Sequence, residues 1–381
     1  MRGLCYAGRL PMLTLEPDIL YVHAPQLGAG LASRLRGRRP LFVCVIASTD
    51  TALVPGISAA GASAEMIPFT AAADAEVVAH GAARCIAGVP SNPLGPPGPA
   101  IITRAALELG SIPHLIVSAG CRIVPDAPYL DLGGRPGGLI TEGAAVPDAG
   151  NLFRRGRELG RRTVRSYDYL VIGESVPGGT TTALALLLAL GVSADGRVSS
   201  SLAGNAHELK SRLAQEALRR LDSRAAAADP LAAVAVLGDP MQAAAAGMAA
   251  GALDEGAPVL LAGGTQMIAV LALLARLASL ERLRLDAGSI GVATTRWVVE
   301  DPTADTAGLM SDVGGYPLVA TPLSFAGSRF RALQQYEENL VKEGVGAGGA
   351  AIAATLAANI RCDELLTRVE AIYERLMTSE D

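Results

Sequence analysis

The sequence contains few aromatic and few charged residues. Of its 381 residues, 4% are aromatic and 18% are charged, whereas 50% are hydrophobic and 43 are glycine. Small aliphatic side chains must therefore fill most of the core, so helices and strands can pack closely. The net charge of −5 argues against a nucleic-acid partner, because such partners are bound through their phosphates by an excess of Lys and Arg.

Cysteine and histidine are also scarce. The five cysteines are far apart in the sequence, no two form a CxxC pair, and there are four histidines. This pattern predicts neither a disulfide framework nor a zinc site, so we expect no metal. Unpaired cysteines are typical of a reducing compartment, and we therefore expect the protein in the cytoplasm.

The most apolar window, residues 257–275, is interrupted in its middle. Gly263, Gly264, Thr265 and Gln266 break the run, whereas a membrane span needs about 20 consecutive apolar residues. A strand, a turn and a helix explain the window better, and we expect no membrane partner.

Strand-like and helix-like segments alternate along the chain. The strand-like runs are residues 41–48, 114–119, 167–173, 232–238, 258–264 and 317–322. The helix-like runs are residues 72–86, 101–109, 180–190, 206–221, 240–253, 265–277 and 328–343. Such alternation predicts an α/β fold with a parallel, Rossmann-like sheet and helices on both faces.

Two features suggest how this fold is divided. Residues 1–35 and 345–381 flank the alternating region, and we expect them to form a small helical subdomain beside a large domain of residues 36–344. Residues 91–99 (SNPLGPPGP) cannot continue a helix or a strand. They form either a loop over the site or, as we favour, a plain linker.

Residues 169–191 (YLVIGESVPGGTTTALALLLALG) form the most informative segment. A strand-like run, a short Pro/Gly loop and three threonines precede an apolar helix. Such a junction directs backbone N–H groups and the positive end of the helix dipole at one point, which suits an anion such as phosphate. Glu174 lies beside this point, which suggests that the anion belongs to a substrate.

The same segment fits most of the P-loop pattern GxxxxGK[ST]. Gly179 stands where that pattern needs a lysine, and without the lysine a nucleoside triphosphate lacks its main counter-charge. We therefore predict a monophosphate site rather than an NTPase. A plain turn with Thr180 as the helix N-cap explains the motif equally well.

Ligands of parallel sheets bind at the carboxyl ends of the strands. Candidate residues at three predicted strand ends are Asp50, Gly238, Asp239, Gly263 and Gly264. Residues 344–349 (GVGAGG) match GxGxxG but follow a predicted helix rather than a strand, so a dinucleotide site is disfavoured. Glu343, just before them, either lies in a cleft where the glycines let a ligand approach or is a solvated residue at a helix end.

Four segments together resemble the nicotinate-nucleotide–dimethylbenzimidazole phosphoribosyltransferase family, and in particular its branch from archaea and some bacteria. They read FVCVIASTDTALVPGISAAG, GESVPGGTTTALALLLALG, LGDPMQAAAAGMAAGALDEGAPVLLAGG and LVKEGVGAGGAAIAATL. They are similar to the family's ADHGV-x-x-EGVSAYP, GEMGIGNTTTAAALLAAL, GGLEIAAMAGAYLACAQRGIPVLVDGF and RLGEGSGAALAVPLL, in the same order.

The resemblance implies a reaction. The family displaces nicotinate from nicotinate mononucleotide with a nitrogen of 5,6-dimethylbenzimidazole or a related aromatic base, inverting C1′, and so makes an α-ribotide for the cobamide lower ligand. The resemblance also implies a homodimer without a metal or an organic cofactor. Glu343 would be the general base, supported by Glu174. The other implied substrate-binding residues are Gly178, Gly179, Thr180 and Thr181 at the phosphate, and Asp50, Gly238, Asp239, Gly263, Gly264, Gly344 and Gly346.

The sequence departs from the family pattern on the acceptor side. Gly179 replaces the family's Asn, and residues 289–301 (SIGVATTRWVVED) stand where the family has a histidine-bearing SAEPGH segment. The alternatives are therefore a non-catalytic protein that binds a phosphorylated metabolite, or an assembly subunit in cobamide biosynthesis.

Overall fold

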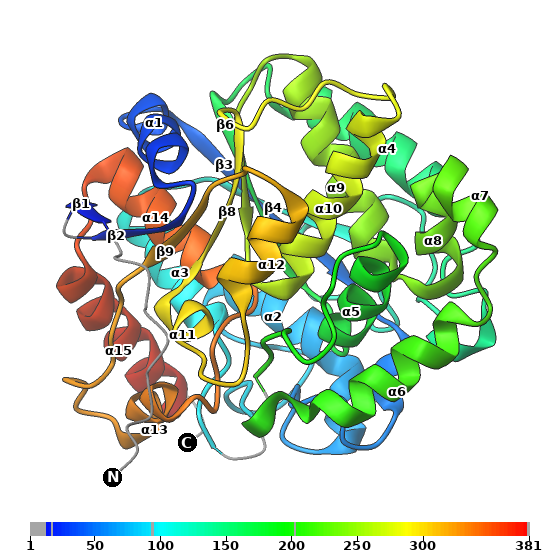
Figure 1. Ribbon diagram of the computed structural model, residues 1–381. Helices are drawn as coiled ribbons and strands as arrows, with labels where there is room; N and C mark the ends of the chain where they lie inside the picture. The colour runs from blue at the N-terminus through cyan, green and yellow to red at the C-terminus, as the bar shows by residue number, and fades with distance from the viewer. Residues whose placement is uncertain (1–12, 17, 93–94, 202, 379–381) are drawn as a thin grey trace, which may run out of the picture.

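The computed structural model describes residues 13–16, 18–92, 95–201 and 203–378. Within them, one sheet of nine strands runs through the molecule in the order β1-β2-β9-β8-β7-β6-β3-β4-β5 (Figure 1). Neighbours from β9 to β5 are parallel, whereas β1 and β2 are antiparallel to each other and β2 is antiparallel to β9. The strands are β1 Leu13–Glu16, β2 Ile19–His23, β3 Pro40–Ala47, β4 His114–Gly120, β5 Tyr129–Asp131, β6 Tyr169–Ser175, β7 Val259–Ala262, β8 Ile290–Thr295 and β9 Leu318–Thr321.

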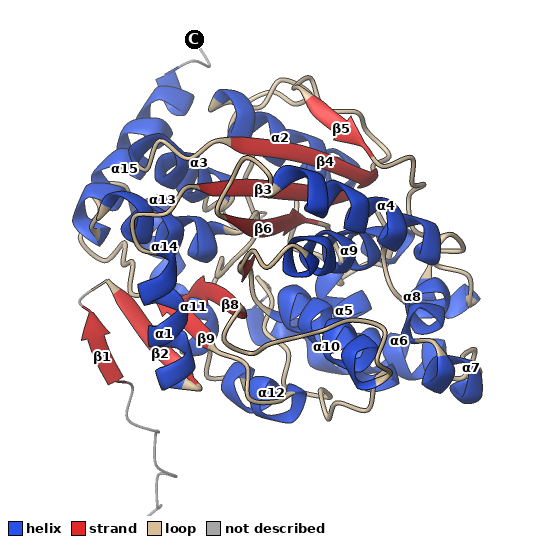
Figure 2. Cartoon of the chain, turned by 90° about the horizontal axis from the view of Figure 1, so that it is seen from above, coloured by secondary structure: helices blue, strands red, loops and turns tan. Residues whose placement is uncertain are grey.

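Helices cover both faces of this sheet (Figures 1 and 2). One face holds α1 Pro25–Leu35, α2 Thr70–His80, α3 Ala100–Leu109, α11 Arg296–Val299, α13 Arg331–Gln334, α14 Ala347–Ala358 and α15 Cys362–Thr378. The other face holds α4 Ala149–Thr163, α5 Gly179–Ala189, α6 His207–Leu218, α7 Ser223–Ala228, α8 Pro230–Leu237, α9 Pro240–Asp254, α10 Thr265–Ser279 and α12 Thr306–Val313. The predicted α/β fold is confirmed.

Strand β3 shows why the sheet is buried on both sides. All eight of its residues are buried. Leu41, Val43 and Val45 contribute to the core with α5, α9 and α10, whereas Phe42 and Cys44 contribute to the core with α2, α3 and α14. A continuous apolar run of this kind is typical of a parallel strand with helices on both faces.

Glycines let two helices on one face approach each other closely. In α4, a Cβ at Gly156 or Gly160 would lie 2.4 or 2.1 Å from a carbonyl oxygen of α9. In α9, a Cβ at Gly247 or Gly251 would lie 2.1 or 2.0 Å from a carbonyl oxygen of α4. These distances are shorter than any ordinary contact, so this core needs the small residues that dominate the sequence.

The two ends of the described chain contribute strands as well as helices. β1 and β2 extend the main sheet beside β9, and α1 and α14 pack on the same face. The sequence had suggested helices alone for residues 1–35. Residues 1–12 and 379–381 of the predicted small subdomain lie outside the described residues, and its boundaries stay a prediction.

Two predicted elements are wrong. Residues 232–237 of the predicted strand 232–238 belong to helix α8, because Asp229 caps the helix by accepting a hydrogen bond from the Leu231 N–H and Pro230 occupies its first turn. Residues 328–343 do not form one long helix: α13 is short, a 3-10 turn follows, and Asn339 has a positive φ of 62°. Strands β1, β2, β5 and β8 were not predicted.

The order of the strands predicts where a ligand-binding crevice should lie. From β3 the chain first builds outward through β4 and β5, and then returns to add β6, β7, β8 and β9 on the other side. The carboxyl ends of β3 and β6 therefore lie at a topological switch point, where open parallel sheets usually bind their ligands.

Candidate functional site

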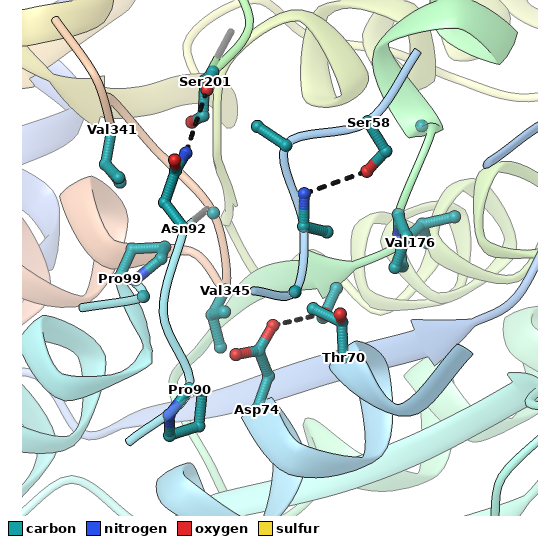
Figure 3. Close-up of a pocket in the computed structure, with 18 of the residues that line it drawn as sticks. Ser58, Thr70, Asp74, Pro90, Asn92, Pro99, Val176, Ser201, Val341 and Val345 are labelled. Carbon is teal, nitrogen blue, oxygen red and sulfur yellow. Dashed lines mark hydrogen bonds between the residues drawn. The ribbon is translucent and has the colours of Figure 1, made fainter. Parts of the chain in front are cut away.

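A pocket of about 220 Å³ lies at the carboxyl ends of these strands (Figure 3). Its walls come from separate segments of the chain, within residues 57–62, 66–74, 86–92, 98–99, 174–180, 199–201, 264–266 and 341–345, together with Val298. The segment predicted as a plain linker contributes Ser91, Asn92, Gly98 and Pro99 to the wall. The other interpretation of that segment, a loop over the site, therefore describes it better.

Glu174 lies in this pocket at the end of β6 and is 4% exposed. Burial, and then the charges of Asp239 and Glu343, raise the pKa of Glu174 to about 8. A carboxyl group with this pKa keeps its proton at neutral pH when the pocket is empty.

Glu343 lines the same pocket from the loop before α14. Its Oε2 accepts hydrogen bonds from Thr294 Oγ1 at 3.0 Å and Thr295 N at 2.9 Å, and its Oε1 accepts from Gly344 N and Gly348 N, both at 3.2 Å. Burial raises the pKa of Glu343 to about 7 even though these bonds lower it. Since Gly348 is in the first turn of α14, the carboxylate also caps this helix.

Two further helices begin at the pocket without a side-chain cap. Gly178, with a φ of 77°, precedes α5, and Gly264 precedes α10. Thr180 and Gln266, on the first turns of these helices, are 3.5 Å apart between Oγ1 and Oε1. Helix N-termini of this kind favour an anionic group, so this part of the pocket suits a phosphate.

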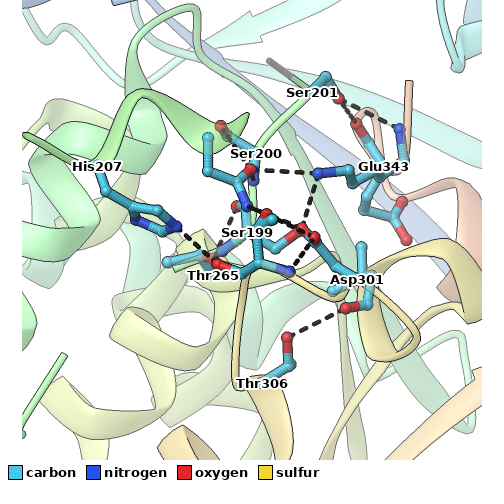
Figure 4. A network of polar contacts seen from close by, with 12 residues as sticks. Ser199, Ser200, Ser201, His207, Thr265, Asp301, Thr306 and Glu343 are labelled. Atoms are coloured by element: carbon cyan, nitrogen blue, oxygen red, sulfur yellow. Dashed lines mark hydrogen bonds and ion pairs between the residues drawn. The ribbon is translucent and has the colours of Figure 1, made fainter. Parts of the chain in front are cut away.

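A buried polar network backs the pocket (Figure 4). Lys342, next to Glu343, forms an ion pair with Asp301 at 2.7 Å and also donates to Asn205 Oδ1 at 3.2 Å. Ser199, in the pocket wall, donates to the same Asp301 at 2.7 Å. This network joins loops that are more than a hundred residues apart and fixes the wall of the pocket.

The structure brings seven of the predicted site residues together in the pocket wall. They are Glu174, Gly178, Gly179, Thr180, Gly264, Glu343 and Gly344. Thr181 and Gly263 are buried and adjoin wall residues in the sequence. Gly346 lies in contact with Gly173, and a Cβ added at Gly346 would be 2.9 Å from the Gly173 Cα.

Asp50, Gly238 and Asp239 do not line the pocket. Asp50 forms an ion pair with Arg122. Gly238 and Asp239 lie at a junction of two helices rather than at a strand end, because the predicted strand before them is helix α8. Asp239 caps α9 and accepts a hydrogen bond from Thr182. It affects the site because its negative charge raises the pKa of Glu174.

Several pocket residues were not predicted from the sequence. Asp74, on α2, is 6% exposed and accepts a hydrogen bond from Ser175 Oγ at 2.7 Å. Burial raises its pKa to about 6. A carboxylate inside an apolar helical run was an available signal for Asp74, whereas nothing in the sequence marked Ser199 or Lys342 as neighbours of the site.

From the sequence we expected neither a metal site nor a membrane span, and the residues that the structure describes can be searched for both. Among its residues, no group of three or more His, Cys, Asp and Glu side chains could hold a metal ion. None of the described helices combines the length and the hydropathy that crossing a membrane would need.

Comparisons with known proteins agree with the sequence resemblance. Residues 135–283 match the family model described as Phosphoribosyltransferase. A UPF0284 protein of Sulfurisphaera tokodaii is 43% identical over 342 residues, which cover 90% of this chain and 95% of that protein. A UPF0284 protein of Gloeobacter violaceus is 47% identical over 362 residues, which cover 94% of each.

Two solved structures from Thermus thermophilus share the fold. One is a nicotinate-nucleotide-dimethylbenzimidazole phosphoribosyltransferase, with a TM-score of 0.58, 19% identity and coverage of 88% of both chains. The other is CobT, with a TM-score of 0.57, 18% identity and coverage of 90% of this chain and 88% of that one. The chain therefore belongs to the UPF0284 family, and it shares its fold with the nicotinate-nucleotide-dimethylbenzimidazole phosphoribosyltransferase of Thermus thermophilus.

Proposed function

We propose that this protein transfers the phosphoribosyl group of nicotinate mononucleotide to a ring nitrogen of 5,6-dimethylbenzimidazole or a related aromatic base, giving an α-ribotide for cobamide synthesis. One observation carries the proposal: Glu174 and Glu343 line the same pocket as the uncapped N-termini of α5 and α10. The pocket thus offers an anion site and two carboxyl groups to one ligand. As part of the proposal, the protein acts in the cytoplasm as a homodimer.

The charges of the pocket suit each part of this reaction. The phosphate binds where the helix N-termini supply positive potential. The C1′–nitrogen bond breaks and its electron pair leaves with nicotinate, so positive charge develops on the ribosyl centre. In this proposal the ionised carboxylate of Glu343 stabilises that charge, whereas Glu174, which keeps its proton at neutral pH, does not contribute a negative charge.

As the unprotonated ring nitrogen of the acceptor bonds to C1′, the N–H group of the same ring must lose its proton. Glu343 is the better general base of the two carboxyl groups, because its pKa is about 7 whereas that of Glu174 is about 8. Its carboxylate is held by four donor groups, and the Thr294 hydroxyl among them can rotate away to free a lone pair on Oε2. Glu343 then takes the ring proton while Thr295 N and Gly348 N keep its orientation.

The test is a mass-spectrometric turnover assay with nicotinate mononucleotide and a panel of benzimidazoles, purines and phenols. We expect a new ribotide from the wild type and a rate reduced by about 10²–10⁴-fold in Glu343→Gln, which is the usual contribution of a general base. Glu158→Gln, on an exposed part of α4, is the matched control and should react like the wild type. A Glu343→Gln protein that reacts at the wild-type rate contradicts the assigned role.

A second candidate function is binding of a phosphorylated metabolite without catalysis. The observation that favours it is the set of hydrogen bonds that already occupy both oxygens of Glu343, as in a purely structural helix cap. In that case nicotinate mononucleotide should raise the melting temperature although no base in the panel is consumed.

A further inference from the structure

Asp74 is a third carboxyl group in the pocket and has no role in the reaction described above. Its residue is 6% exposed, and Ser175 Oγ donates a hydrogen bond to its Oδ2 at 2.7 Å. Its other oxygen, Oδ1, accepts no hydrogen bond from the described residues. Figure 3 shows the carboxylate pointing from α2 into the pocket. This oxygen faces the open pocket, and a ligand that fills the pocket and displaces its water must supply a donor or leave the oxygen unpaired.

The walls around this oxygen suit a flat ring. A Cβ on Gly98 would lie 3.8 Å from Asp74 Oδ1 and 3.4 Å from the carbonyl oxygen of Pro90. Pro90, Pro99 and Val345 line the same pocket and lie on one side of the carboxylate in Figure 3. Proline, glycine and valine offer apolar contact on the faces of a ring, which leaves Asp74 as the polar group that the ring edge meets.

The charge of Asp74 decides which part of a ligand can lie there. A phosphate or a carboxylate would be repelled by Asp74 and attracted to the N-termini of α5 and α10. Burial raises the pKa of Asp74 to about 6, so the group is mainly ionised at pH 7 and acts as an acceptor. The ligand part at Asp74 is therefore uncharged or cationic, and it donates.

We infer that Asp74 selects the acceptor base, and that this base is a nitrogen heterocycle that carries an amino group or a second N–H, rather than a ring with methyl substituents alone. The inference rests on the proposed function. Glu343 takes the proton of the ring N–H as the other ring nitrogen bonds to C1′, while Asp74 Oδ1 accepts a hydrogen bond from the additional N–H group. A base without that group leaves Oδ1 unpaired and is discriminated against.

The experiment compares matched bases, namely adenine with purine and an aminobenzimidazole with 5,6-dimethylbenzimidazole. Calorimetry measures binding of each base in the presence of nicotinate mononucleotide, and mass spectrometry measures kcat/KM. In the wild type we expect the amino-bearing member of each pair to be preferred by at least about tenfold, as in sites that hydrogen-bond a substrate N–H. Asp74→Ala and Asp74→Leu should both lose this preference and keep the affinity for nicotinate mononucleotide. Glu158→Gln should keep both.

The outcomes separate this inference from the proposed function. If no base reacts but amino-bearing bases bind better and the Asp74 variants lose that preference, the selection of bases by Asp74 stands as a property of binding and the transferase proposal fails. If the wild type turns over bases without regard to their amino group, or the variants keep the preference, the inference is overturned and the transferase proposal stands. If both Asp74 variants bind nicotinate mononucleotide more weakly, and to the same extent whichever base is present, Asp74 contacts the ribose and the inference is also overturned.

Discussion

The buried ion pair between Lys342 and Asp301 gives the sharpest test of the network that backs the pocket. The Lys342 Nζ and Asp301 Oδ2 atoms are 2.7 Å apart, and the two side chains are 2% and 1% exposed. Lys342→Met removes the cation and keeps most of the volume of the side chain. We expect the free energy of unfolding to fall by about 3–5 kcal/mol, because a buried carboxylate is left without its counter-charge.

Other contacts of Asp301 place the expected loss at the lower end of that range. Asn205 and Ser199 donate to Oδ2 at 2.9 and 2.7 Å, and Thr303 donates to Oδ1 at 3.0 Å from N and 2.8 Å from Oγ1. These neutral donors remain in the variant and partly stabilise the charge. We therefore expect a loss of about 3 kcal/mol at pH 7.

The loss should also depend on pH. Burial alone would raise the pKa of Asp301, but hydrogen bonds from Asn205, Lys342 and Ser199 outweigh it and hold the pKa well below its usual range. The stabilisation by Asp301 is therefore present above the unfolded pKa of about 3.9 and is lost as the pH falls below it. Without Lys342 the folded pKa of Asp301 rises, so the difference between wild type and variant should shrink as the pH falls below about 4.

Urea unfolding of the wild type and Lys342→Met at pH 7 and in acid measures both effects. Arg361→Met is the control, since Arg361 and Asp363 are paired at 3.2 Å but are 62% and 72% exposed, and it should leave the stability almost unchanged. Adding Asp301→Leu to Lys342→Met should recover most of the loss. The reasoning is refuted if Lys342→Met is as stable as Arg361→Met, or if its loss does not change with pH.

Two further predictions concern the packing of the helices and the titration of the site. Gly251→Ala should lower the free energy of unfolding by about 1–3 kcal/mol through overpacking, because its Cβ would lie 2.0 Å from a carbonyl oxygen of α4. A Cβ added at Gly30 in α1 would meet nothing within 4 Å. Gly30→Ala should therefore raise the free energy of unfolding, measured in urea, by up to about 1 kcal/mol. Equal effects of the two changes would contradict the packing argument. Because burial and the charges of Asp239 and Glu343 raise the pKa of Glu174 from 4.5 to about 8, the folded state holds a proton between these values that the unfolded state lacks. Stability should therefore fall as the pH rises from about 4.5 to about 8. Glu174→Gln should lessen this slope in unfolding measured at several pH values, and an unchanged slope would show that other groups cause it.

The fold could be predicted where local pattern and tertiary position agree. The runs that became β3, β4, β6, β7 and β9 are apolar, short and followed by glycine or polar residues, and each proved to be a strand. The run at 232–238 has the same composition, but it follows Asp229 and Pro230, which start a helix. Strand β8 was missed because its apolar run is short, and because Gly291 within it reflects the close approach of Pro317 rather than a turn.

The proposed phosphate side of the candidate site was easier to predict than the proposed acceptor side, for a physical reason. A helix N-terminus at the end of a strand is a local structure, so residues 173–180 contain most of the information that it needs. The acceptor side is assembled from α2, the 91–99 loop, β8 and the 341–345 loop. Asp74 and Ser175 are 101 residues apart in the sequence, and no local pattern specifies that they meet.

The loop that holds Glu343 shows how such a meeting is fixed. Val345 has a φ of 55°, which is strained for a β-branched residue, between Gly344 at 148° and Gly346 at 69°. Its N–H donates to the carbonyl oxygen of Glu174 at 2.9 Å, and its carbonyl oxygen accepts from Thr103 Oγ1 at 2.9 Å. These bonds hold the strained residue in place, because without them the loop could relax into an ordinary conformation. These bonds thus keep the segment of Glu343 beside that of Glu174 in spite of the strain, and the glycines of GVGAGG serve this backbone crossing rather than a dinucleotide.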